Sequence, residues 1–458
     1  MVASVNPRAA GVTAVPSVTW AELRALNPAS YNPSQIFHVS DVGVGGSYWY
    51  SNGVRWVSVN SRAMAKRQGL IRLGRAPDAT GVASTTLRTT QQAWRVPFDV
   101  YGFQIGLESN LAAATTFSLC KAAIIGSAGN TLTQALDDVA NASSATPFSV
   151  TWGGGSAGAT VPARTALDAP AAITWSDTIY QKIQAGQVLV ERMLWPYPGS
   201  AWNYPYAATG LSSAEFLAAN PALATMHWHN TTDQVTGWTS WATNSSNGSG
   251  NLSVQYLRLL TAEPVITVAA IGDSTLTGQV NSGSVPLAPV WAACEALSAS
   301  GLRFVPYCRG WGGKEPSTFY NYALDIINAT IKPDVLIWQA WSQNDTAQTV
   351  NVQEIALTMD IVSRCRAAGI VPIVVTGIPI NSWVTPTYDS QEAARVALNA
   401  LIRSAGEIII DADAVISNGV TPVADYNASY GTDQHPNAAG YAALVLEYIN
   451  ALKQVGAR

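Results

Sequence analysis

Four short stretches between residues 264 and 456 contain residue types that together could perform nucleophilic acyl transfer. The first is Gly272-Asp273-Ser274-Thr275-Leu276, in which a serine follows directly after an apolar run. At a strand-to-helix corner, the N–H of such a serine and the dipole of the next helix favour negative charge nearby. Taken alone, Gly-Asp-Ser is also a common turn, so its meaning depends on the other three stretches.

The second and third stretches offer hydrogen-bond donors for a developing oxyanion. Three glycines stand within residues 310–313, and glycine lets backbone N–H groups approach a ligand closely. A plain glycine loop is the alternative reading. Asn344 follows the apolar run 335–338 and could aim its side-chain N–H at an oxyanion. Asp345 beside it is better suited to cap the next helix.

The fourth stretch contains the only histidine after residue 229. His435 follows Asp433 by two residues and stands just before an apolar-periodic segment. A histidine beside a carboxylate is a natural general base. A lone surface histidine is the alternative.

In this order, the four stretches closely resemble the SGNH hydrolases, also called the GDSL family of esterases and lipases. The resemblance covers roughly residues 264–456. It implies that Ser274 is the nucleophile and His435 the base. It also implies an oxyanion hole made by the N–H of Ser274, the N–H of Gly313 and the side chain of Asn344, with no metal and no organic cofactor.

Three positions in this resemblance need comment: the glycine that donates to the oxyanion, residue 342 and the acid of the triad. Gly310 is the alternative to Gly313. Ser342 stands where the third block of the family usually begins with Gly, so a non-glycine residue must find an acceptable φ there. The family expects its acid three residues before the histidine, where this chain has Thr432. We therefore predict that Asp433 completes the triad, and the alternatives are Asp425, Asp411, Asp413 or a Ser–His dyad.

The segments around the four stretches alternate between predicted strands and predicted helices. The strands are 265–271, 304–307, 335–338, 371–376 and 408–410, and the helices are 291–299, 352–368, 395–405 and 438–453. This alternation predicts an α/β domain over residues 263–458, with a parallel sheet in three layers as in flavodoxin-like folds. Catalytic groups of such folds lie at the carboxyl ends of the strands.

The preceding residues show other patterns. Residues 63–262 contain short alternating runs between Gly, Ser, Asn and Pro clusters, which predict an all-β sandwich. They resemble weakly the sandwich that precedes the catalytic domain in some secreted SGNH esterases, where it could contact carbohydrate. Residues 1–62 contain a helix at 19–26, with Thr19 as its cap, and a β-hairpin signal within 36–62. That last segment resembles short β modules of bacteriophage tail-fibre and tail-spike proteins.

Composition excludes several classes of protein. The 458 residues include only 12% charged side chains with a net charge of −4, which gives no basic footprint for nucleic acid. No apolar run reaches the length of a membrane span, and the N-terminus lacks the pattern of a Sec-type signal peptide. The four cysteines are scattered and are expected to be buried thiols. His227 and His229 lack an evident third ligand, so no metal site is predicted there.

These observations predict a carboxylic ester hydrolase, and the expected substrate is an O-acetylated polysaccharide of a bacterial surface. The expected location is a virion tail or the extracellular space, with other tail proteins as partners and a trimer as the oligomer if the chain is a tail protein. One alternative is a lipase or short-chain esterase acting on lipid or small esters. The other is a receptor-binding tail module whose hydrolase fold has lost its chemistry.

Overall fold

A computed structural model describes most of residues 87–456 and a smaller share of the residues before them. The chain divides into two compact units, residues 1–68 and residues 69–458. The described residues are 17–27, 30, 36–39, 47–51, 56–59, 68–72, 87–95, 97–109, 114–125, 145–163, 172–196, 225–230, 233, 235–238, 246–247, 253–261, 263–280, 283–284, 288–310, 313–344, 350–379, 389–417 and 435–456.

The described part of the first unit has one short helix and four strands. Helix α1 (Trp20–Ala25) begins at Thr19, and Thr19 and Glu22 form a reciprocal capping box, which confirms the predicted cap. Strands β3 (Ser47–Ser51) and β4 (Trp56–Val59) pair as the predicted antiparallel hairpin. The sheet is completed by β2 (Ile36–Val39), antiparallel to β3, and β1 (Ser17–Val18), parallel to β2.

The second unit is organised around a sheet of nine strands in the order β12-β7-β16-β5-β20-β17-β21-β22-β23. Its last six strands are parallel, as the alternation of strands and helices predicts. They are β5 (Gln68–Arg72), β20 (Phe304–Gly310), β17 (Ile266–Gly272), β21 (Val335–Gln339), β22 (Val371–Val375) and β23 (Ile408–Ile410). Strands β20 and β21 are buried along their whole length, which explains their continuous apolar runs.

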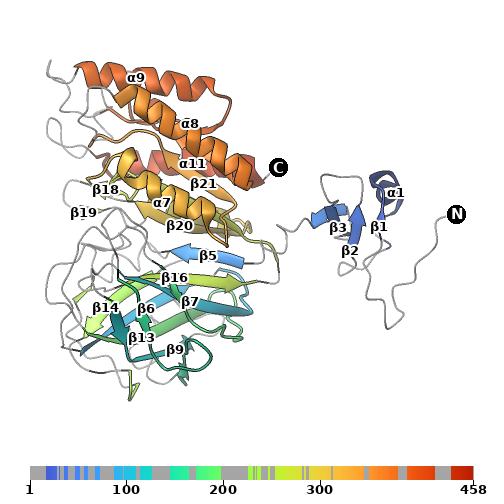
Figure 1. Cartoon of the computed structure of the whole chain (residues 1–458), viewed down its shortest axis with the longest axis vertical. Helices are drawn as coiled ribbons and strands as arrows, with labels where there is room; N and C mark the ends of the chain where they lie inside the picture. Colours follow the sequence, from blue (N-terminus) through green and yellow to red (C-terminus); the bar gives the residue numbers. More distant parts are fainter. Residues whose placement is uncertain are drawn as a thin grey trace. The chain divides into compact units, whose positions relative to one another are not determined.

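Helices cover both faces of the parallel strands (Figure 1). On one face, a single buried cluster includes α7 (Pro316–Asn328), α8 (Val350–Ala368) and α9 (Asp389–Ser404). On the other face, a second cluster includes α6 (Pro289–Ala299), α10 (Ala412–Ile416) and α11 (Ala438–Gly456). The predicted three-layer α/β arrangement is therefore present. The sequence analysis does not predict α7, although its residues are amphipathic, or α10, which is only five residues long.

Antiparallel strands make up the rest of the second unit. The three that join the nine-stranded sheet are β12 (Thr174–Trp175), β7 (Gly102–Ser109) and β16 (Ser253–Leu260). A six-stranded sheet has the order β10 (Phe148–Ser149), β9 (Leu119–Ile125), β13 (Val188–Pro196), β6 (Leu87–Arg95), β14 (Thr225–Asn230) and β15 (Ser246–Asn247). Two small pairs are β8 (Thr115–Phe117) with β11 (Ala159–Val161) and β18 (Gln279–Val280) with β19 (Gly283–Ser284).

The six-stranded sheet packs against the antiparallel part of the nine-stranded sheet. One buried cluster joins apolar side chains of β7 and β16 to those of β9 and β13. A free-standing sandwich over residues 63–262 is not confirmed, because β7 and β16 belong to the same sheet as the parallel strands. Strand β5 also lies within 63–262 in sequence, yet it pairs with β20 through Arg72 and Tyr307. The domain boundaries at 62 and 262 remain predictions.

A buried cluster of charged and aromatic side chains joins these two parts of the sheet. The guanidinium of Arg309 at the end of β20 donates to Glu108 Oε2 of β7 (2.9 Å) and to Tyr256 Oη of β16 (2.7 Å). The side chains of Arg309 and Glu108 have no exposed surface. Burial alone would lower the pKa of Arg309, but Glu108 together with Tyr256, Tyr307 and Asp325 outweighs it and raises the pKa well above its ordinary value. Asp325 of α7 pairs with the same guanidinium (3.2 Å).

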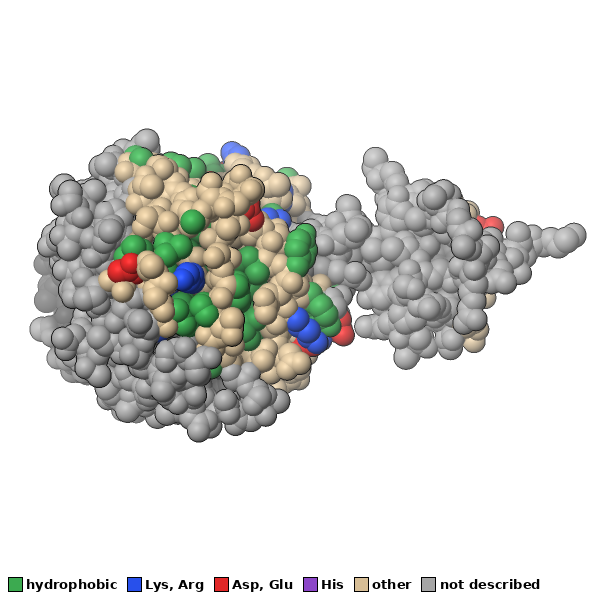
Figure 2. Space-filling view, turned by 90° about the horizontal axis from the view of Figure 1, so that it is seen from below, with side chains coloured by type: hydrophobic (Ala, Val, Ile, Leu, Met, Phe, Trp, Pro, Cys, Tyr) green, Lys and Arg blue, Asp and Glu red, His purple; other side chains and the backbone are tan. Residues whose placement is uncertain are grey.

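The described surface has few charged side chains, as the composition predicts, and the cysteines are buried. In the view of Figure 2, the described part of the surface carries apolar and uncharged polar side chains, with a few charged ones among them. All four cysteines are buried and unpaired with one another, as predicted. None of the helices among the described residues is long and apolar enough to cross a membrane.

Removal of Glu108 should destabilise the protein strongly, because it leaves the Arg309 charge buried without its main partner. We expect Glu108→Ala to lower the free energy of unfolding by about 3–5 kcal/mol. Arg364→Ala, which breaks an exposed ion pair with Asp360 on α8, is the control and should cost at most about 0.5 kcal/mol. Urea unfolding of the two variants and the wild type measures both values, and equal losses would contradict the prediction.

Candidate active site at the carboxyl ends of the central strands

The candidate site forms where three parallel strands end side by side. Strand β17 pairs with β20 on one side, where Gly272 lies opposite Gly310. It pairs with β21 on the other side, where Ile271 lies opposite Trp338. The stretches that follow these three strands therefore meet at one edge of the sheet, as the rule for α/β folds predicts.

Ser274 and His435 lie within hydrogen-bond distance although 161 residues separate them in sequence. Ser274 Oγ is 2.7 Å from His435 Nε2. Both side chains are buried, with 4% and 9% of their surfaces exposed. At this distance the imidazole can take the hydroxyl proton, so the two residues have the geometry of a nucleophile and its general base.

The start of α11 fixes the backbone beside His435. Asn437 accepts the N–H of Gly440 through its side-chain Oδ1 (3.0 Å) and the N–H of Tyr441 through its carbonyl oxygen (3.0 Å). Asn437 is therefore the N-cap of the helix. Because His435 precedes this cap by two residues, the helix start determines where the imidazole can lie.

Contacts of Thr277 and Gln339 hold the turn that contains Ser274. The Thr277 hydroxyl donates to the carbonyl oxygen of Ser274 (2.8 Å), and Asp273 N–H donates to Gln339 Oε1 (3.1 Å). A Cβ at Gly272 would lie 2.2 Å from Gln339 Oε1, so only glycine fits beneath this side chain. The sequence analysis misses Thr277 and Gln339, because an uncharged polar residue has no distinctive pattern until the pairing of β17 with β21 is known.

The side chain of Asn344 lies against the loop that contains Gly313. Asn344 Nδ2 is 3.2 Å from the carbonyl oxygen of Lys314 and 2.9 Å from Ser342 Oγ. Gly313 directly precedes Lys314 and has a φ of +71°, a conformation that glycine adopts without strain. Two of the three oxyanion donors implied by the family resemblance, Gly313 and Asn344, thus lie on neighbouring loops.

Gly310, the alternative oxyanion donor, packs against the turn after Ser274. A Cβ at Gly310 would lie 2.1 Å from Thr277 Cγ2 and 3.3 Å from the carbonyl oxygen of Asp273. The missing side chain therefore lets the end of β20 approach the nucleophile turn closely. This packing explains why position 310 requires glycine, whether or not its N–H binds an oxyanion.

The interior beneath the site keeps Tyr448 neutral. Burial raises the pKa of the Tyr448 hydroxyl on α11, and the neighbouring Cys308 and Asp273 raise it further. Tyr448 therefore remains protonated at neutral pH.

Several residues identified from the sequence lie outside the described part of the chain. They include the predicted acid Asp433, as well as Asp425 and Asp345. His227 and His229 lie in strand β14, and their side chains are outside the description. Among the described residues, no three His, Cys, Asp or Glu side chains gather in a way that could hold a metal ion.

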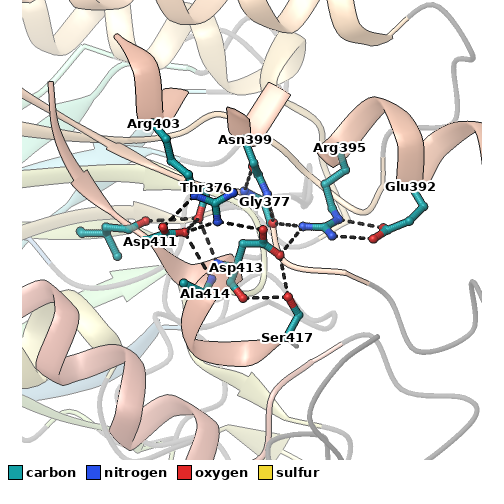
Figure 3. A network of polar contacts seen from close by, with 11 residues as sticks. Thr376, Gly377, Glu392, Arg395, Asn399, Arg403, Asp411, Asp413, Ala414 and Ser417 are labelled. Carbon is teal, nitrogen blue, oxygen red and sulfur yellow. Dashed lines mark hydrogen bonds and ion pairs between the residues drawn. The ribbon is translucent and has the colours of Figure 1, made fainter. Parts of the chain in front are cut away.

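The alternative acids Asp411 and Asp413 belong to an arginine network at the ends of β22 and β23 (Figure 3). Asp411 pairs with Arg403 (2.6 Å) and accepts the N–H of Ala414 at the start of α10. Asp413 pairs with Arg395 (2.6 Å). Burial would raise the pKa of each carboxyl, but the paired arginines and the hydrogen bonds outweigh it, so both pKa values are lowered. These contacts give both carboxylates structural roles.

Comparison with known proteins finds similarity in solved structures. No model of a protein family matches the chain, and no curated protein matches it. A GDSL-like lipase from Bacteroides thetaiotaomicron is 15% identical, with a TM-score of 0.32 over 41% of this chain and 88% of that one. An acetyl xylan esterase from Geobacillus stearothermophilus is 16% identical, with a TM-score of 0.32 over 41% of this chain and 94% of that one. A Bacillus subtilis protein is 13% identical, with a TM-score of 0.33 over 92% of this chain and 88% of that one.

The structural neighbours thus include a putative acylhydrolase, a GDSL-like lipase and an acetyl xylan esterase, all with low identity to this chain. Similarity at this level does not assign an activity. The resemblance of residues 36–62 to phage tail proteins finds no support among these matches and remains a prediction.

A methyl group at Gly310 should disturb the site through Thr277. We expect Gly310→Ala to cost about 1–3 kcal/mol of unfolding free energy, since its Cβ would overlap Thr277 Cγ2. Thr277→Ser removes Cγ2 but keeps the hydroxyl that binds the Ser274 carbonyl. The double variant should therefore regain most of the loss in denaturant unfolding. Losses that simply add in the double variant would show that this contact is not the cause.

Proposed function

We propose that the chain is a serine esterase of the SGNH type that hydrolyses carboxylic esters. The observation that carries the proposal is the 2.7 Å contact between Ser274 Oγ and His435 Nε2 at the carboxyl edge of a parallel sheet. A serine hydroxyl is a weak nucleophile unless an adjacent base accepts its proton. A buried imidazole at this distance supplies that base.

The proposed reaction has two steps. As Ser274 Oγ attacks the ester carbonyl carbon, His435 Nε2 takes the hydroxyl proton and a tetrahedral oxyanion forms. The bond to the alcohol oxygen then breaks, and the departing oxygen receives this proton from His435. Water next attacks the acyl-enzyme and gives a proton to His435, which returns it to Ser274 Oγ as the carboxylic acid leaves. One ester and one water thus yield one acid and one alcohol.

Three donors are proposed to stabilise the oxyanion: the N–H groups of Ser274 and Gly313 and the side chain of Asn344. Their support is that Asn344 lies against Lys314, the residue after Gly313, beside the turn of Ser274. Removing one such donor typically costs about 10²–10³-fold in kcat. Asp433 is proposed to orient His435.

The proposed substrate is an O-acetyl ester on a bacterial surface polysaccharide, hydrolysed by a tail protein. Its support is the tail-like segment 36–62 and the 16 tryptophans and 17 tyrosines of the sequence, whose rings are suited to stack on sugars. Acetate released from an O-acetylated polysaccharide, and no fatty acid released from lipid, would distinguish it from a lipase.

Substitution of Ser274 is the direct test of the mechanism. We expect Ser274→Ala to lower kcat on p-nitrophenyl acetate by at least about 10⁴-fold, and Asn344→Ala by about 10²–10³-fold. Ser298→Ala is the matched control, because it removes a hydroxyl that binds the carbonyl oxygen of Phe304 at the other end of β20. A wild type no faster than buffer on this ester and on O-acetylated polysaccharide would overturn the proposal in favour of a binding protein.

The role of Asp433 can be tested separately. An aspartate that orients the imidazole should make Asp433→Ala lose about 10⁴-fold in kcat. Asp413→Asn is the comparison, because this carboxylate binds Arg395 and should affect unfolding more than turnover. Full activity of Asp433→Ala would leave a Ser–His dyad as the mechanism.

A further inference from the structure

The hydroxyl of Ser342 occupies a buried position between the nucleophile turn and the loop of Asn344. The side chain of Ser342 is fully buried. Its Oγ lies 2.7 Å from Asp273 Oδ2 and 2.7 Å from the carbonyl oxygen of Lys314. It also accepts from the backbone N–H of Asn344 (3.2 Å) and from Asn344 Nδ2 (2.9 Å).

These contacts use the full capacity of a hydroxyl group. A serine hydroxyl has one proton to donate and two lone pairs to accept with. The two lone pairs receive the backbone and the side-chain N–H of Asn344. The single proton goes to one of the two neighbouring acceptors, Asp273 or the carbonyl of Lys314. The four contacts together fix the position of the Ser342 oxygen.

The distances around Asn344 Nδ2 also fix the direction of its amide. Nδ2 is 2.9 Å from Ser342 Oγ and 3.2 Å from the oxygen of Lys314, and these two oxygens are 2.7 Å apart. By the law of cosines, the two oxygens subtend an angle of about 52° at Nδ2. The two N–H bonds of a primary amide diverge by about 120°. A single N–H directed between the two oxygens lies about 26° from each, so one three-centre bond satisfies both contacts and leaves the second N–H for another acceptor.

We propose that Ser342 is a positioning residue that aims this second N–H of Asn344 at the oxyanion. The proposal rests on the proposed esterase function and deepens it. Ser342 holds one N–H of the amide together with Lys314, so the other N–H is set in place before substrate binds. Preorganised donors of this kind stabilise a transition state without reorganisation during the reaction.

The same hydroxyl connects the amide to the nucleophile. Asp273 precedes Ser274 directly, and its Oδ1 accepts the N–H of Thr275 (2.8 Å) while its Oδ2 faces Ser342. A continuous set of contacts therefore runs from the Ser274 turn through Asp273 and Ser342 to Asn344.

Steady-state kinetics of Ser342→Ala on p-nitrophenyl acetate are the first part of the test. Loss of about one neutral hydrogen bond from the oxyanion donor should lower kcat about tenfold and leave KM within about twofold. Ser298→Ala again serves as the control, and its kcat should equal that of the wild type. Unfolding measurements on each variant exclude a loss of folded protein as the cause. A Ser342→Ala variant with the kcat of the wild type would overturn the proposal.

A double-mutant cycle decides whether Ser342 acts through Asn344. If it does, Ser342→Ala should lower kcat by less than about twofold in the Asn344→Ala background. A full tenfold loss in that background would overturn the proposal, because Ser342 would then act elsewhere.

Crystal structures of the wild type and Ser342→Ala give a reading that does not depend on turnover. We expect the Asn344 amide to rotate when the hydroxyl is lost, because the shared N–H then keeps only the carbonyl oxygen of Lys314 as its acceptor. An unchanged amide would overturn the proposal. Failure of the esterase function gives a different result, in which the wild type does not hydrolyse esters or Ser274→Ala retains the activity.

Discussion

The register of β17 between its two parallel neighbours is the constraint on which the candidate site depends. Hydrogen bonding sets Gly272 opposite Gly310 and Ile271 opposite Trp338, so the chain leaves all three strands at the same level. A shift of one residue would send each side chain to the other face of the sheet. Two close contacts agree with this register: Gln339 lies over Gly272, and Thr277 lies against Gly310. Both contacts connect the strand ends with the turn of Ser274.

Buried polar contacts hold the strand ends on both sides of the site. Arg309 ends β20 and binds Glu108 and Tyr256 of the antiparallel strands, so the strand that leads into the glycine loop is held by residues far away in sequence. On the other side of the site, Arg395 and Arg403 bind the carboxylates that follow β23. In both places a paired and hydrogen-bonded charge replaces apolar packing, which makes each contact sensitive to loss of one partner.

The parallel sheet and most of its helices could be predicted from the sequence, because buried strands and amphipathic helices leave local patterns of apolar residues. The pairing of Ser274 with His435 was predicted from the order of the motifs, and its 2.7 Å geometry needed the structure. The roles of Gln339 and Ser342 depend on which strand ends are neighbours, which is a long-range property. Helix α10 is too short to give a periodic signal, strand β5 is far in sequence from the other parallel strands, and Asp433 lies outside the described residues.

The position of β5 has a consequence for how the protein is made. This strand lies at the boundary of the parallel part of the sheet, between β16 and β20, and its partner residue Tyr307 follows Arg72 by 235 positions, from 72 to 307. A ribosome adds about 5–20 residues per second, so β5 would wait roughly 10–50 seconds for β20 during synthesis. Pairings at such long sequence separation are slow to form, and an unpaired strand edge is open to wrong partners in the meantime. The edge of β5 that pairs with β20 therefore needs protection from wrong partners during this whole interval.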